Sequence, residues 1–173
     1  MCIRDSYNRS TFERELKSEI ERSAHAKVAV LFIDVDDFKF INDRFGHSVG
    51  DEVIKYVAGC IKQRVKGSGF AGRFGGDEFV LCITDPKQIE EIESLSLDLI
   101  DELYEGYHSE LANVSINVKA SIGIAFYPEH GDDSNKVVAA ADEAMYFVKK
   151  NGKANYHIYQ PEDSEMEDLQ HTL

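Results

Sequence analysis

Two consecutive acids beside two glycines are the part of this sequence best suited to chemistry. Gly75, Gly76, Asp77 and Glu78 lie between two short apolar runs. Such runs joined by Gly-Gly predict a β-hairpin, because glycine reaches the positive φ angles of a tight turn without steric cost. The backbone beside the two acids would then be open to a ligand. Adjacent carboxylates repel each other unless a cation lies near them, so the turn indicates a cation site.

A second acidic cluster follows a predicted buried strand. The apolar run 28–33 has the length of a central strand, and Asp34-Val35-Asp36 comes directly after it. Alternation at a strand end would place Asp34 and Asp36 on one side, with the Val35 carbonyl also available. Magnesium prefers one or two carboxylates plus substrate phosphates, so Asp34 and Asp77 could share it if strand and hairpin are neighbours. The plainer alternative is that all these acids are solvated loop ends.

Other metal and phosphate motifs are absent from the sequence. An EF-hand loop beginning at Asp34 would need Gly and Glu where Lys39 and Phe45 stand. There is no Gly-Lys-Ser/Thr of a P-loop, no Cys-x-x-Cys and no His-Glu-x-x-His. These absences exclude the common calcium, P-loop and zinc motifs.

The chain resembles the GGDEF domain, the diguanylate cyclase family, from about Asn8 to Tyr159. The resemblance rests on ordered motifs at residues 34–43, 46–51, 75–79, 121–125, 141–146 and 149–153. It implies an α+β fold in which a palm-like, ferredoxin-related and mostly antiparallel sheet is flanked by helices, as in other nucleotidyl cyclases. Such an order of elements, with an antiparallel hairpin, also fits the sequence pattern.

The resemblance also implies a reaction. Members of this family condense two GTP into cyclic di-GMP and two pyrophosphates at the interface of a domain homodimer, as a bacterial second messenger. Two Mg²⁺ or Mn²⁺ ions per active site would be held by Asp34, the Val35 carbonyl, Asp77 and Glu78. Asp77 and Glu78 would be the catalytic acids, with Glu78 acting as a metal ligand, as a base for the attacking hydroxyl, or as both.

The same resemblance assigns substrate contacts. Asp51 would accept hydrogen bonds from the donor edge of guanine, a pairing that suits a carboxylate, and Asn42 would read the remaining edge. Lys39, Lys149 and Lys153 would contact the triphosphate, beside the open backbone of Gly75 and Gly76. Each residue has a plainer alternative: a helix cap for Asp51, a turn for Asn42, and a helix-dipole contact for Lys149 and Lys153.

The chain departs from the family pattern at three places, one of which is residues 3–6, where Ile-Arg-Asp-Ser stands instead of the family's Leu-Thr-Gly-Leu. Residues 66–69 read Lys-Gly-Ser-Gly where the family often carries Arg-x-x-Asp, a product-inhibition site. Lys153 and Ala154 stand where the family has Arg and Asn. A lysine loses the bidentate fork of arginine but keeps the charge, so we expect activity to survive.

Composition bounds the remaining possibilities. The 173 residues suffice for one domain, the net charge of −13 argues against a nucleic-acid surface, and no apolar run is long enough to contact or span a membrane. Two of the three cysteines lie in apolar patterns, as expected in the cytoplasm. We expect residues 1–6 to be a truncation point or artificial junction after a missing sensory domain, 7–160 to be the cyclase domain, and 161–173 to be an acidic, mobile tail.

The hydrophobic pattern predicts the elements. Helices are expected at 11–24, 40–45, 50–64, 86–104 and 136–151, and strands at 27–34, 114–126 and 155–159 besides the hairpin. Two alternatives to an active cyclase stay open. One is a non-catalytic GTP-binding module that regulates a partner, and the other is a related cyclase that makes a mixed guanine–adenine product.

Overall fold

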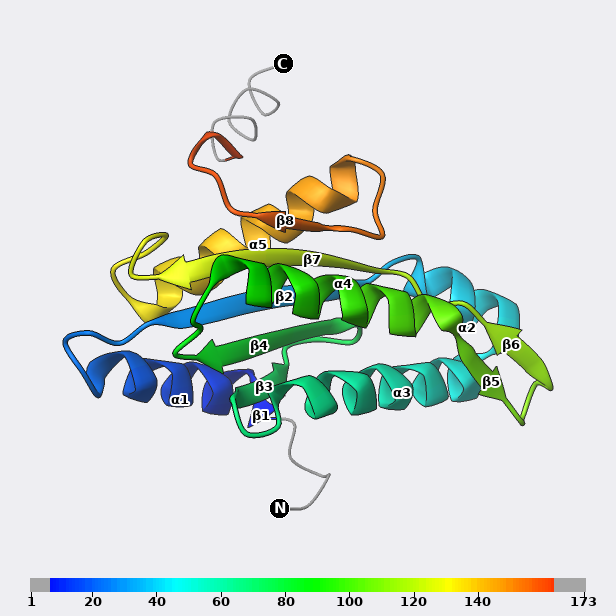
Figure 1. Ribbon diagram of the computed structural model, residues 1–173. Coiled ribbons are helices and arrows are strands. Elements are labelled where there is room, and N and C mark those ends of the chain that lie inside the picture. The colour runs from blue at the N-terminus through cyan, green and yellow to red at the C-terminus, as the bar shows by residue number, and fades with distance from the viewer. Residues whose placement is uncertain (1–6, 164–173) are drawn as a thin grey trace.

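A six-stranded sheet with helices on both faces forms the body of the protein (Figure 1). The computed structural model describes residues 7–163, so the predicted junction at 1–6 and residues 164–173 of the predicted tail lie outside the described residues. In spatial order, the strands are β1 (Tyr7–Asn8), β3 (Gly69–Arg73), β4 (Glu78–Thr84), β2 (Val28–Val35), β7 (Ala120–Tyr127) and β8 (Tyr156–Ile158).

Within residues 7–163, five helices accompany the sheet. They are α1 (Arg9–Glu21), α2 (Phe38–Phe45), α3 (His47–Val65), α4 (Ile89–Glu105) and α5 (Ser134–Lys150). None of the helices within residues 7–163 is both long and apolar enough to cross a bilayer.

Strand pairing confirms the predicted mostly antiparallel sheet. The central strand β2 pairs antiparallel with β4 on one side and with β7 on the other, and β4 also pairs antiparallel with β3. Only the two outer pairs, β1 with β3 and β7 with β8, are parallel. The termini of β2, β4 and β7 that carry polar residues therefore meet at one end of the sheet.

The alternation of β2 divides the core into two layers. Leu31 and Ile33 pack with side chains of α3 and α4 on one face, whereas Val30 and Phe32 pack with those of α1 and α5 on the other. Burial on both faces explains why the run 28–33 is continuously apolar rather than alternating. Because both faces are covered, the strand end after Ile33 has a fixed position.

Gly123 allows α5 to approach β7 very closely. A Cβ atom at this position would lie 2.0 Å from the Ala141 carbonyl oxygen and 2.1 Å from the Met145 nitrogen. A glycine in a strand often marks such an approach of another backbone. The contact fixes α5 against the sheet, and with it the position of Lys149 near the helix end.

The predicted strand 114–126 is wrong as a single element. It divides into β6 (Val114–Ile116), which pairs with β5 (Tyr107–Ser109) in a separate two-stranded sheet, and β7, which belongs to the main sheet. Between them, the Val118 amide donates to the Leu103 carbonyl at 3.0 Å, which ties the segment to the end of α4. A β-branched run does not reveal which partner strand it will meet.

Candidate active site

Acids from two neighbouring strands meet at one end of the sheet. In the β2–β4 ladder Asp34 stands directly opposite Glu78, and in the β2–β7 ladder it stands opposite Ser121. The Val35 amide donates to the Asp77 carbonyl at 3.1 Å, which holds the turn before β4 against the end of β2. We call Asp34, Asp77 and Glu78 the acid cluster. The structure thus brings together the two acidic segments that the sequence separates by about forty residues.

The pKa values of Asp34 and Glu78 indicate that the negative charge around them is poorly compensated. Burial raises the pKa of Asp34 to about 6; the Lys149 charge lowers it, while Asp77 and Glu78 raise it further. Burial also raises the pKa of Glu78, with added repulsion from Asp142 and Asp77. A bound cation would relieve this repulsion. Asp142, on α5, is a neighbour of Glu78 that the sequence analysis did not single out.

The donor set suits a hard cation that keeps open positions. In residues 7–163, no three or more His, Cys, Asp or Glu side chains come together in a group that could hold a metal ion by themselves, so an ion here would need ligands besides the carboxylates. Carboxylates together with a backbone carbonyl are the oxygen donors that magnesium accepts, and this ion usually takes its remaining ligands from water and substrate phosphates. The acid cluster with the Val35 carbonyl fits that chemistry.

The glycines of the turn act differently from the prediction. Neither Gly75 nor Gly76 is among the described glycines with positive φ, so the predicted reason for them is wrong. A Cβ atom on Gly75 would lie 3.3 Å from Glu78 Oε2, whereas Gly76 has open space around it. The guanidinium of Arg73 donates to both of their carbonyl oxygens, at 3.1 and 2.6 Å. Glycine at 75 therefore leaves room for the Glu78 carboxylate.

Lys149 contacts the carboxylate of Asp34 in β2 and that of Asp36 just after it. Its Nζ lies 3.1 Å from Asp34 Oδ1 and 2.6 Å from Asp36 Oδ1, and the lysine side chain is only 19% exposed. Burial opposes its charge, but the hydrogen bond to Asp36 and the charges of both acids raise the pKa of Lys149. The ammonium is thus held at the edge of the acid cluster, and is more than a helix-dipole contact.

Asp36 is the residue that the sequence analysis undervalued. Its carboxylate is fully buried, and it accepts hydrogen bonds from Lys149, from the Ser121 hydroxyl at 2.7 Å and from the Ala154 amide at 2.9 Å. We call this arrangement the Asp36 anchor. The signal in the sequence was a second Asp two positions after the first, but its burial depends on β7 and on the turn after α5.

The other two predicted triphosphate lysines make exposed ion pairs. Lys153 Nζ donates to Asp37 Oδ1 at 2.7 Å, and this hydrogen bond lowers the pKa of Asp37. Lys39 Nζ donates to Asp43 one helical turn away at 3.0 Å. Exposed pairs of this kind are weak, so both ammonium groups can exchange their partner for a phosphate.

The predicted base-reading residues lie together at the junction of α2 and α3. A Cβ atom on Gly50 would lie 1.8 Å from Asn42 Oδ1, so the amide of Asn42 occupies the space that Gly50 leaves free. Asp51 follows Gly50 and is exposed. The plainer alternatives for both are wrong: α3 begins at His47 after Gly46, so Asp51 lies inside the helix, and Asn42 lies inside α2.

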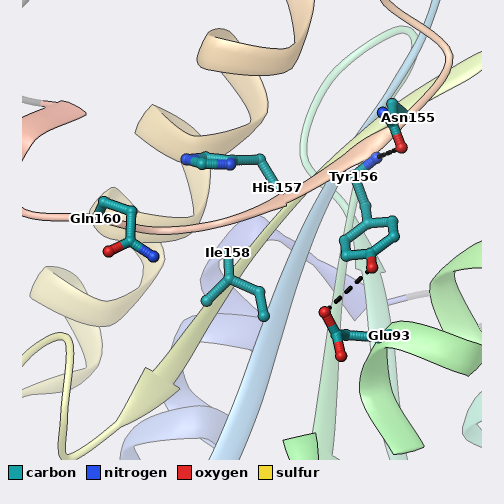
Figure 2. A pocket seen from close by; sticks show the side chains of 6 residues that line it. All are labelled: Glu93, Asn155, Tyr156, His157, Ile158 and Gln160. Carbon is teal, nitrogen blue, oxygen red and sulfur yellow. Dashed lines mark hydrogen bonds between the residues drawn. The ribbon is translucent and has the colours of Figure 1, made fainter. Parts of the chain in front are cut away.

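A shallow depression of about 310 Å³ lies elsewhere, along β8. It is lined by Glu93, Asn155, Tyr156, His157, Ile158 and Gln160. The Tyr156 hydroxyl donates to Glu93 at 3.1 Å across it, as Figure 2 shows. No predicted site residue lines this depression, and the Tyr156 hydroxyl and the Glu93 carboxylate in it are hydrogen-bonded to each other.

Comparisons with known proteins agree with this geometry. The family model described as "Diguanylate cyclase, GGDEF domain" matches residues 5–155. The chain is 34% identical to the signaling protein YkoW of Bacillus subtilis over 80% of its length, and 34% identical to the diguanylate cyclase DosC of Escherichia coli over 88%. It spans only 17% of YkoW and 33% of DosC.

Solved structures give the same result. The GGDEF domain of TpbB (YfiN) from Pseudomonas aeruginosa superposes with a TM-score of 0.90 at 29% identity, covering 97% of this chain and 98% of that one. The GGDEF domain of DgcB from Caulobacter crescentus, solved in complex with c-di-GMP, has a TM-score of 0.83 at 25% identity, with coverage of 91% and 94%. With its fold, its acid cluster and these relatives in agreement, the chain belongs to the GGDEF diguanylate cyclase family.

Proposed function

We propose that this chain is the catalytic domain of an active diguanylate cyclase in the cytoplasm. It would condense two GTP into cyclic di-GMP, with each 3′-hydroxyl attacking the α-phosphate of the other nucleotide. The observation that supports this most directly is the pairing of Asp34 with Glu78 across the β2–β4 ladder, with Asp77 next to it. Family members that lost their activity need not keep a costly concentration of uncompensated charge.

Divalent cations are the implied cofactor. The acid cluster and the Val35 carbonyl would hold two Mg²⁺ or Mn²⁺ ions. When bound, such ions neutralise phosphate charge and make a hydroxyl easier to deprotonate. The raised pKa values of Asp34 and Glu78 support this assignment, because each carboxylate gains more from a neighbouring cation than a solvated surface acid would.

Glu78 is proposed to accept the proton of the attacking hydroxyl. A carboxylate whose pKa is raised is a better base than a solvated one. As the proton moves to Glu78, the 3′-oxygen forms its bond to the α-phosphorus, and the bond from that phosphorus to the pyrophosphate oxygen breaks. The negative charge of Asp77 helps to raise the pKa of Glu78, and the Asp77 carboxylate would contribute to the cation site.

The remaining predicted residues would bind and orient GTP. Asn42 in α2 and Asp51 in α3 lie near the place where these two helices meet, and each would read a different edge of the guanine base. Lys39 and Lys153 can move from exposed acid partners to the triphosphate. The open backbone at Gly75 and Gly76 would let phosphates come close to the turn.

Catalysis is proposed to need two domains. One domain offers one acid cluster and one set of base-reading residues, whereas the product joins two nucleotides through two bonds. We therefore propose a homodimer in which the two sites face each other. A sensory segment on the N-terminal side of the domain would control how often they meet.

A turnover assay tests the proposal. Purified protein with GTP and Mg²⁺ or Mn²⁺ should release pyrophosphate and form cyclic di-GMP, identified by mass. Fusing a dimeric coiled coil to the N-terminus should raise the rate, because the reaction needs two copies. Glu110→Gln, on the exposed turn between β5 and β6, is the matched control and should keep full activity. A mixed product formed only when ATP is added would instead identify a cyclase of different specificity.

A second candidate is a GTP-binding regulatory module without turnover. The similarity to the cyclic di-GMP phosphodiesterase PdeR of Escherichia coli, 30% identical over 90% of this chain, favours it. Tight GTP binding without any product, even in the coiled-coil fusion, would establish this candidate and reject the cyclase.

A further inference from the structure

The Asp36 anchor joins three separate parts of the chain. Asp36 lies at the end of β2, Ser121 lies in β7, and Ala154 lies in the turn after α5. All three of its donors reach a carboxylate with no solvent exposure. A buried carboxylate that accepts several hydrogen bonds is rigid, because a shift away from any donor would leave charge unpaired in a low-dielectric environment.

This anchor controls where the Lys149 ammonium lies. The contact with Asp36 Oδ1 is 2.6 Å and that with Asp34 Oδ1 is 3.1 Å, so the cation is shared but sits closer to Asp36. An ammonium has three N–H donors. Two of them can be taken by the two carboxylates, which lie 3.1 and 2.6 Å from Nζ.

The anchor also fixes the turn that follows α5. Lys153 and Ala154 both have positive φ, 63° and 50°, a conformation that non-glycine residues rarely adopt. The Ala154 amide donates to Asp36 Oδ2, and the Lys153 amide donates to the Val148 carbonyl at 3.0 Å. These two hydrogen bonds hold the strained turn and place Lys153 beside Asp37.

We propose that Asp36 is a positioning residue, which keeps the Lys149 ammonium from neutralising Asp34 and so leaves Asp34 available to a divalent cation. In this role Asp36 would contact Lys149, and neither the substrate nor the divalent cation. The inference rests on the cation site of the proposed function. Lys149 and a divalent cation compete for the Asp34 carboxylate. The contact of Lys149 with Asp36 weakens its hold on Asp34.

The competition predicts changes of opposite sign. In Asp36→Asn the amide keeps the size of the side chain but loses its charge, so Asp34 becomes the only carboxylate that Lys149 contacts in the described residues. Divalent cations should then bind more weakly. In Lys149→Gln the competing cation is gone, while an N–H donor remains for Asp36, so divalent cations should bind more tightly.

The test measures Mn²⁺ binding to the full chain without nucleotide, using the EPR signal of free Mn²⁺. We expect at least fivefold weaker binding in Asp36→Asn and about threefold tighter binding in Lys149→Gln. Two controls separate other effects: Lys150→Gln removes the neighbouring positive charge, and Ser121→Ala removes one hydrogen bond to Asp36 without changing charge. Both should stay within twofold of the wild type.

Several results would overturn the inference. Wild-type affinity in a folded Asp36→Asn variant would show that Asp36 does not protect Asp34. If that variant does not fold, Lys149→Gln decides, and binding no tighter than in Lys150→Gln rejects the competition. A wild-type chain that binds no Mn²⁺, even with GTP present, would instead reject the cation site of the proposed function, and this inference with it.

Discussion

Two aspartates of the same strand end, Asp34 and Asp36, have opposite environments. Asp34 faces other acids, and its pKa is raised to about 6 even though Lys149 lies 3.1 Å away. Asp36 is fully buried, yet three donors compensate its charge. The charge of Asp34 is poorly compensated, whereas Asp36, two positions later, accepts hydrogen bonds from three donors. Identical side chains on one strand can therefore serve binding and architecture separately.

The largest expected effect concerns the acid cluster. Glu78→Gln should lower the rate of cyclic di-GMP formation by at least about 1,000-fold, because the group that accepts the proton is lost. The amide has nearly the same shape, so GTP binding measured by calorimetry should change by less than about threefold. Turnover close to wild type would remove Glu78 from the mechanism. It would also remove the support for a binding role of the acids around Asp34.

The second prediction concerns Asp36, the carboxylate that accepts three hydrogen bonds. Asp36→Asn should lower the free energy of unfolding by about 3 kcal/mol, since it removes the buried charge that three donors surround and leaves Lys149 with one carboxylate partner instead of two. Urea denaturation followed by circular dichroism measures this change. A loss below about 1 kcal/mol would mean that the three hydrogen bonds of the carboxylate do not stabilise this end of the sheet.

Asp34→Asn should act in the opposite direction. A carboxylate whose folded pKa is raised binds its proton more tightly in the native state, so its contribution is fully present below about pH 3.8 and is lost as pH rises through about 6. The rise of the Asp34 pKa from 3.8 to about 6 corresponds to at most about 3 kcal/mol, and the partial exposure of Asp34 reduces this. Without metal at pH 7.5 the variant should therefore gain about 1 kcal/mol in the free energy of unfolding.

Two conditions sharpen this third prediction. The gain should disappear at pH 4, where the wild-type carboxyl is largely protonated in the native state. Added Mg²⁺ should also reduce the gain, because it would stabilise the wild type and not the variant. A variant that is less stable than the wild type at pH 7.5 would show that the Lys149 contact outweighs the repulsion among the acids.

The smallest expected loss of stability is that of Ser121→Ala. Its hydroxyl donates one of the three hydrogen bonds to Asp36, and a buried bond to a charged acceptor contributes about 1–2 kcal/mol. The melting temperature should fall by a few degrees, on the order expected for a domain of this size. An effect as large as that of Asp36→Asn would mean that the anchor fails as a unit when any donor is lost.

Much of the architecture could be predicted from the sequence. The continuous apolar run 28–33 predicted a buried central strand, and the helices of the structure begin and end within a few residues of the predicted ones. The run 114–126 was misjudged because its division depends on contacts with α4 and β5, which lie elsewhere in the chain. The hydrophobic pattern of a segment indicates its periodicity and its length, but it does not identify the strand with which the segment will pair.

At the site, the sequence by itself determined which side chains are available: two acidic segments after strands, two glycines, and lysines near the end of a helix. Only the tertiary structure decided that Asp34 stands opposite Glu78, and that Asp36 is buried and accepts hydrogen bonds from Ser121 and Ala154. The reason is physical. A carboxylate's pKa and hydrogen bonds depend on distances of a few ångströms between residues that lie 40 to 120 positions apart, and only strand register and helix packing set those distances.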